Sequence, residues 1–68
     1  MKAGDRVWVW PQAPRRPGRP SKGTIERPRK DHGEVFEVVL DGEVVPDLIH
    51  VSGLEPLSVV DLIAEVEA

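Results

Sequence analysis

Residues 34–42 read EVFEVVLDG and carry the clearest secondary-structure signal in the chain. Phe36, Val38 and Leu40 occupy every second position, which is the spacing of a strand with one face toward a core. Asp41-Gly42 then gives a strong hairpin signal, because a type I′ turn needs positive φ angles that this pair tolerates. The stretch therefore predicts a half-buried strand that ends in a tight turn.

Shorter strands are expected on both sides of this turn. Residues 43–51 would return as a strand in which Pro46 marks an edge or a bulge, since proline donates no hydrogen bond to a ladder. Upstream, residues 22–29 hold a short strand, and residues 5–10, DRVWVW, are rich in the β-branched and aromatic residues that favour strands. Residues 54–57 can supply a last short strand.

The end of the chain changes to a helical period. Four aliphatic residues fall at i, i+3, i+4 and i+7 and would line one face of a helix over residues 58–68: Val59, Leu62, Ile63 and Val66. Ser58 would cap this helix, with Asp61 three residues later as its capping-box partner. A helix of about ten residues is marginal alone, so its apolar stripe needs a partner surface.

Together these elements predict an all-β fold, a small barrel that is closed or nearly closed. About five short antiparallel strands in residues 1–57 would form it, with a long basic, proline-rich loop at residues 11–22. Residues 58–68 would form a C-terminal amphipathic acidic helix packed on the barrel. The 68 residues leave room for one domain, and they include no cysteine and no apolar run long enough to span a membrane. Since a signal-peptide pattern is also missing, we expect a cytoplasmic protein without disulfides.

The two ends of the predicted barrel resemble a known family. Residues 4–9, GDRVWV, and residues 49–57, IHVSGLEPL, are similar to the ends of the C-terminal domain of retroviral and Ty3/gypsy-type integrases. That domain is an SH3-like barrel that begins GDxVWV and ends near HVSxLKP, with a basic loop after its first strand. The resemblance covers residues 4–57 and implies nucleic-acid contacts through basic residues, here Arg15, Arg16, Arg19 and Lys22. Glu55 stands where the family has a basic residue, and no catalytic domain accompanies the barrel, so an integrase is not expected.

Charge divides the chain into two parts of opposite sign. All nine Lys and Arg residues lie in the first thirty positions: Lys2, Arg6, Arg15, Arg16, Arg19, Lys22, Arg27, Arg29 and Lys30. Only two carboxylates accompany them, giving a formal charge of +7, whereas residues 31–68 hold ten carboxylates and neither Lys nor Arg, giving −10. Such asymmetry indicates a polyanionic partner, or opposite charges that cancel between neighbouring strands of one sheet.

The loop at residues 11–22 concentrates the positive charge. Its prolines recur every three residues, which matches the polyproline II repeat and predicts a locally stiff loop hinged near Gly18. Basic side chains on such a loop suit phosphate binding. We expect primary phosphate contacts from four residues and supporting contacts from three more: Arg15, Arg16, Arg19 and Lys22, then Arg27, Arg29 and Lys30.

Three other interpretations of this loop stay open. Gly18-Arg19-Pro20 is the centre of an AT-hook, although Pro17 stands where the hook has an arginine that enters the minor groove. Residues 11–16 fit PxxPxR, a polyproline ligand of SH3-type domains. The simplest alternative is a stiff solvated loop whose arginines pair with the acidic half of the chain.

Trp8 and Trp10 lie on one face of the first strand, with Val7 and Val9 on the other. If the valines face the barrel interior, the two indoles lie outside and form a stacking platform for bases or a peptide. The expectation that we favour is that the C-terminal helix covers both indoles with its apolar stripe.

Catalysis, metal binding and cofactor binding are not expected. With His32 and His50 as the only histidines and no cysteine, a zinc site made by the protein is improbable. His50 is interpreted as a structural residue, and no phosphate-loop or dinucleotide fingerprint occurs. The sequence therefore predicts a small non-enzymatic module that binds DNA or RNA. The alternative is a protein-interaction module, accessory subunit or homodimer that uses the barrel face, the proline loop or the acidic helix, with no membrane contact.

Overall fold

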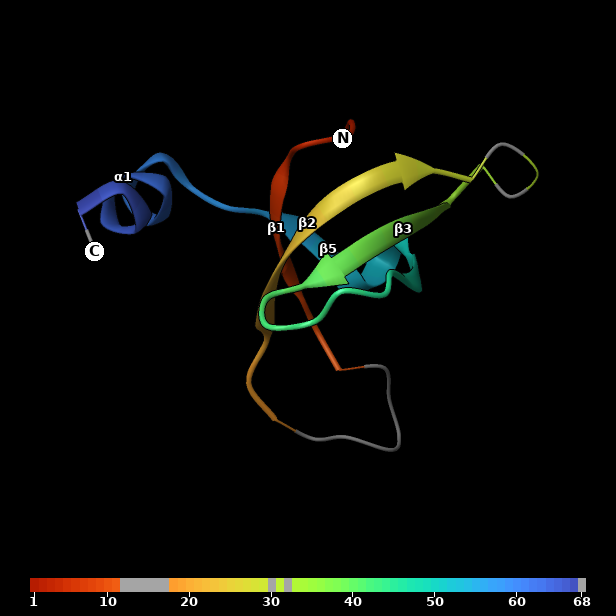
Figure 1. Cartoon of the computed structure of the whole chain (residues 1–68), viewed down its shortest axis with the longest axis horizontal. Coiled ribbons are helices and arrows are strands. Elements are labelled where there is room, and N and C mark those ends of the chain that lie inside the picture. The colour runs from red at the N-terminus through yellow and green to blue at the C-terminus, as the bar shows by residue number, and fades with distance from the viewer. Residues whose placement is uncertain (12–17, 30, 32, 68) are drawn as a thin grey trace.

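A computed structural model describes residues 1–11, 18–29, 31 and 33–67 and contains one antiparallel sheet followed by a short helix (Figure 1). The elements in chain order are β1 (Arg6–Val9), β2 (Ser21–Pro28), β3 (Val35–Leu40), β4 (Asp47–His50), a 3₁₀ turn (Val51–Gly53), β5 (Leu54–Pro56) and α1 (Val59–Glu67). The predicted all-β fold of five short antiparallel strands with a C-terminal helix is confirmed.

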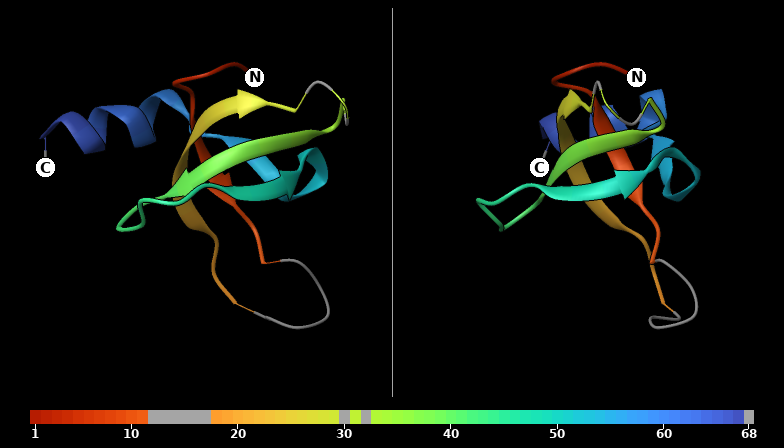
Figure 2. Two further views of the ribbon diagram at one scale, coloured as in Figure 1. Left: turned by 45° about the vertical axis from the view of Figure 1, so that its right-hand side comes forward. Right: turned by 90° about the vertical axis from the view of Figure 1, so that its right-hand side faces the viewer.

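The strands pair in the order β4-β3-β2-β1-β5, so β4 and β5 are the two edges of an open sheet, and the predicted closure into a barrel by strand pairing is not found among the described residues. The three-residue turn after His50 joins these two edges directly. Figure 2 shows the sheet curling around its inner face, with α1 projecting to one side. Pro56 lies on β5, where an edge position tolerates a residue without a backbone N–H.

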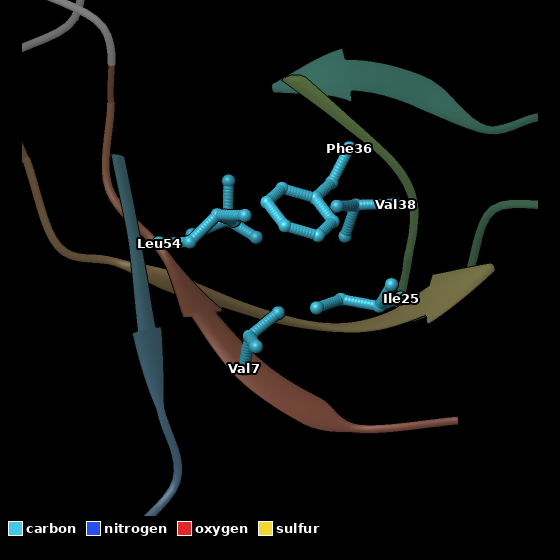
Figure 3. Packing of buried hydrophobic residues seen from close by; sticks show 6 residues of the cluster. Val7, Ile25, Phe36, Val38 and Leu54 are labelled. Atoms are coloured by element: carbon cyan, nitrogen blue, oxygen red, sulfur yellow. The ribbon is translucent and has the colours of Figure 1, made fainter. Parts of the chain in front are cut away.

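The core fills the inner face of the curled sheet (Figure 3). Alternation places Val7 and Val9 of β1 inward, opposite the inward side chains of the other strands. Val7, Ile25 and Val38 are fully buried and make the centre of the cluster. The remaining buried apolar residues are Val9, Phe36, Leu54 and Leu57. The predicted inward face of residues 34–40 is therefore confirmed, and Trp8 of β1 lies on the outer face.

A β-bulge lies in β2 between Ile25 and Arg27. Before the bulge Ile25 pairs with Val38, and after it Arg27 pairs with Glu37. A regular ladder would place Glu26 opposite Glu37, and like charges directly opposite one another are unfavourable. The extra residue replaces that contact with an ion pair.

The turn after β3 differs from the predicted type I′ turn. The Glu43 amide donates to the Leu40 carbonyl at 2.9 Å, which closes a tight turn over Asp41 and Gly42. Only Gly42 has a positive φ, of 88°, whereas type I′ needs two positive angles. The pattern is that of a type II turn. The returning strand also begins at Asp47 rather than at residue 43, directly after Pro46.

Within the described residues, no helix is long and apolar enough to cross a membrane.

Candidate functional site

The proline-rich basic loop connects β1 to β2, and much of it falls outside the described residues. Arg15 and Arg16 belong to that part of the loop. Lys30, between β2 and β3, also falls outside the described residues. Arg19 is described, is exposed, and has no ion pair among the residues that the structure describes. Lys22 is the second residue of β2 and faces outward beside Trp8 of β1.

Trp10 lies at the base of this loop, one residue beyond the last β1–β2 pair, Val9 with Ser21. Its backbone amide donates to the Gly53 carbonyl at 2.8 Å, which fixes the chain against the 3₁₀ turn. Its indole N–H lies 3.4 Å from a Glu55 carboxylate oxygen, and 44% of the residue is exposed. The side chain is therefore partly exposed to solvent at the loop base.

The two arginines at the far end of β2 are engaged by carboxylates. Arg27 Nε donates to Glu37 Oε1 at 3.0 Å, and Arg29 Nη2 lies 3.1 Å from Asp31 Oδ2. Arg29 Nη1 also approaches Glu37 within 3.9 Å, so the half-buried Glu37 lies between two guanidinium groups. At this end of the sheet, opposite charges on neighbouring strands cancel, as the second interpretation of the charge asymmetry requires.

A second polar cluster lies on the outer face of β1 and β2, where Arg6 pairs with Thr24 and Trp8 pairs with Lys22. All five guanidinium N–H groups of Arg6 donate hydrogen bonds. Two reach Asp41 at 2.7 Å, one reaches Thr24 Oγ1 at 2.9 Å, and two reach the carboxylate of Glu65 on α1. These contacts lower the pKa of Asp41 and of Glu65, each chiefly through its hydrogen bonds to Arg6.

The helix meets this cluster through its acidic side. The Trp8 indole N–H donates to Asp61 Oδ2 at 3.3 Å, and Lys22 Nζ lies 3.8 Å from Glu65 Oε2. The same ammonium lies 5.2 Å from the centre of the Trp8 ring, a cation–π contact. The predicted capping box is confirmed, because the Asp61 amide donates to Ser58 Oγ at 3.1 Å and the Ser58 amide to Asp61 Oδ2 at 3.2 Å.

The expectation that the apolar stripe of the helix packs over the tryptophans differs from the structure. Within the described chain no residue of α1 is buried, and Val66 is 85% exposed. Asp61 and Glu65 are one helical turn apart, on the side of α1 away from the stripe. Since their ion pair and hydrogen bonds hold that side against the sheet, the stripe faces outward. Trp8 is half-buried under these polar contacts, and Trp10 stays exposed.

His50 has the structural position that the sequence indicated. Its Nδ1 accepts from the Ser52 amide at 3.1 Å at the start of the 3₁₀ turn, and its Nε2 lies 3.1 Å from Glu34 Oε2. No group of three or more histidine or acidic residues in the described segments is arranged to hold a metal ion.

Sequence reasoning missed the cluster around Arg6. It assigned Asp61 to the helix cap alone and gave Glu65 no role. One available signal was the i, i+4 spacing of these two carboxylates on a helix that holds no basic residue. The other was the alternation of Arg6 with Trp8 on a strand whose valines point inward.

No protein-family model, curated protein or solved structure matches this chain.

Proposed function

We propose that this chain is a small cytoplasmic nucleic-acid-binding module whose basic loop at residues 11–22 contacts phosphates. Residues 7–25 contain four basic side chains and no carboxylate. The observation that carries the proposal is the contrast between loop and sheet. Arg19 is exposed and has no ion pair within the described residues, whereas Arg6 and Arg27 on the sheet are neutralised by carboxylates.

Trp10 supports the same proposal from the loop base. Single-stranded nucleic acids are commonly bound by a basic groove along the backbone together with aromatic side chains on which bases stack. The backbone of Trp10 follows the last β1–β2 pair, Val9 with Ser21, and so continues beside the segment that carries Arg19, while its partly exposed indole donates to Glu55 of β5. In this proposal the loop contacts phosphates and the indole stacks on a base.

The resemblance to integrase C-terminal domains is part of this proposal and stays a prediction. Two features support it. The sheet has five antiparallel strands, and a basic loop follows the first strand. The acidic remainder of the chain would orient binding and limit affinity.

The test is an equilibrium titration of labelled single- and double-stranded DNA and RNA, read by fluorescence anisotropy at about 50 and 200 mM salt. Four phosphate contacts would weaken duplex binding by about 100-fold across this range. Micromolar affinity with that salt dependence is the expected result. If none of these nucleic acids binds at the lower salt concentration, the proposal is wrong.

A second candidate function is protein interaction, and the outward apolar face of α1 favours it. Val59, Leu62, Ile63 and Val66 are all exposed, and a contiguous apolar surface on a small protein commonly marks an interface. In the homodimer form of this proposal, sedimentation velocity shows self-association that increases with protein concentration. Ile63→Glu would remove that self-association. A wild-type chain that stays monomeric at high concentration would contradict the homodimer.

A further inference from the structure

The outer face of β1 and β2 brings two cations and an indole around a single carboxylate. Arg6 Nε lies 3.1 Å from Glu65 Oε1, its Nη2 donates to Glu65 Oε2, and Lys22 Nζ lies 3.8 Å from that second oxygen. The Trp8 ring lies beneath the ammonium of Lys22, and its N–H donates to Asp61 on the same helix as Glu65. The carboxylate comes from α1, which is 59 residues away from Arg6 in the chain.

We propose that Arg6, Trp8 and Lys22 form a second phosphate-binding patch, and that α1 occupies this patch within the same chain through Glu65. The helix then competes with phosphate for the patch. That the ligand is the phosphate backbone of a nucleic acid rests on the proposed function. The proposal that the patch binds a phosphate group does not depend on the proposed function.

The geometry at Glu65 is that of an oxyanion site. The Nε and Nη2 edge of a guanidinium donates two parallel hydrogen bonds, a fork that fits carboxylate and phosphate equally. Lys22 adds a point charge on the second oxygen. The lowered pKa of Glu65, due first to its hydrogen bonds with Arg6, shows that this position favours a negative charge. A phosphate that replaced the carboxylate would meet the same donors.

Arg6 is held in place independently of the helix. Its Nη1 and Nη2 donate to both oxygens of Asp41 at 2.7 Å, and Nη1 also donates to Thr24 Oγ1. These contacts come from the turn after β3 and from β2, so they remain when α1 leaves. They orient the Nε edge of the guanidinium toward the position that Glu65 occupies.

The helix is attached in a way that allows it to leave. It has nine residues, none of them buried, and its polar contacts with the sheet come from Asp61 and Glu65. Partly exposed ion pairs are weakened by salt and by competing ions. The core lies on the other face of the sheet, so release of α1 leaves it covered.

The test uses the full-length chain with Glu65→Gln, and Glu67→Gln as the matched control. Both variants remove one negative charge from the same helix, but Glu67 has no hydrogen bond or ion pair in the described structure. Inorganic pyrophosphate is titrated while NMR follows the Trp8 indole N–H and the Arg6 Nε–H. A Trp10→Phe variant assigns the indole signals. We expect Glu65→Gln to reach half-saturation at a concentration about fivefold or more lower than Glu67→Gln, because the competing group is gone.

The patch proposal is wrong if both variants reach half-saturation at the same pyrophosphate concentration. It is also wrong if pyrophosphate does not shift the NMR signals of Arg6 and Trp8. A second arm titrates a labelled oligonucleotide against the same two variants. If pyrophosphate discriminates between them and neither variant binds the oligonucleotide, the patch stands and the proposed function fails. If both bind the oligonucleotide equally and pyrophosphate does not discriminate, the proposed function stands and the patch fails.

Discussion

Gly23 lies where β2 and β3 approach each other closely. It lies on β2 between Val7 of β1 and Leu40 of β3 and is buried. A Cβ at this position would lie 2.9 Å from a methyl carbon of Val38 and 3.1 Å from the Val39 carbonyl oxygen. The first distance is shorter than real Cβ contacts, the second is tighter than most of them, and the second atom is backbone, which cannot rotate away. Glycine is therefore required at this position by the approach of β3.

Gly23→Ala should destabilise the chain by about 1–3 kcal/mol, the usual cost of overpacking a core. Gly33→Ala is the matched control, since nothing lies within 4 Å of a Cβ built there. Urea unfolding followed by tryptophan fluorescence measures both variants. Equal midpoints for the two variants would show that the close approach of β2 and β3 is not a constraint.

The inward side chains could be predicted from sequence because each depends on alternation alone. Phe36 and Val38 are inward by the period of two, and the valines of β1 follow the same rule. The turn type could not be predicted, because Asp41 keeps a negative φ while its carboxylate binds Arg6 of β1. Residue preferences at a turn do not include such a distant partner.

Helix α1 shows the limit of periodicity at the scale of the element. The spacing of its aliphatic residues correctly predicts a helix and a stripe, and the Ser58 cap is where the sequence placed it. Periodicity does not determine which side of a helix meets the sheet. Here Arg6 and Lys22 bind the acidic side and direct the stripe outward.

Loss of the cap should loosen α1 without affecting the sheet. Ser58→Ala removes the hydroxyl that accepts from the Asp61 amide, and loss of a cap commonly costs about 1 kcal/mol of helix stability. We expect faster hydrogen exchange at the amides of α1 and unchanged exchange in β2 and β3. If the sheet amides exchange faster by the same factor, the helix is part of one cooperative unit with the sheet.

Acid should release α1 from the sheet. Arg6 lowers the pKa of Glu65 first through hydrogen bonds, with Lys22 adding to the effect and Asp41 opposing it. A carboxyl whose pKa is lower in the folded state stabilises that state above its ordinary pKa, and the contribution is lost as pH falls through the lowered value. The docking therefore weakens below pH 4.5, the ordinary pKa of a glutamate.

The measurement is the chemical shift of the Trp8 indole N–H between pH 6 and pH 2. In the wild type this signal should move as α1 is released in acid. In Glu65→Gln the Trp8 signal should move less with pH than in the wild type, because the glutamate that titrates is gone. In Glu67→Gln the signal should move as it does in the wild type. A Glu65→Gln profile that matches the wild type would show that another group controls the docking.

At the scale of the whole molecule, the charge asymmetry divides into two parts. On the sheet, Arg6 and Arg27 meet carboxylates from the acidic half of the chain, as does Arg29 directly after β2. On the loop, Arg19 meets none within the described residues. Sequence alone could count these charges but could not pair them, because the pairs depend on strand register and on the bulge in β2.

The nucleic-acid proposal is tested most directly by comparing two variants with equal loss of charge. Arg16→Gln with Arg19→Gln removes two cations from the loop, and Arg27→Gln with Arg29→Gln removes two that already pair with acidic residues. Anisotropy titration of one labelled oligonucleotide at about 50 and 200 mM salt compares both variants with the wild type. The loop pair should lose most of the affinity and about half of the salt dependence, since about two of four phosphate contacts go, while the sheet pair stays close to the wild type. Equal losses in the two variants would mean that net charge, and not the loop, determines binding, and would contradict the proposal.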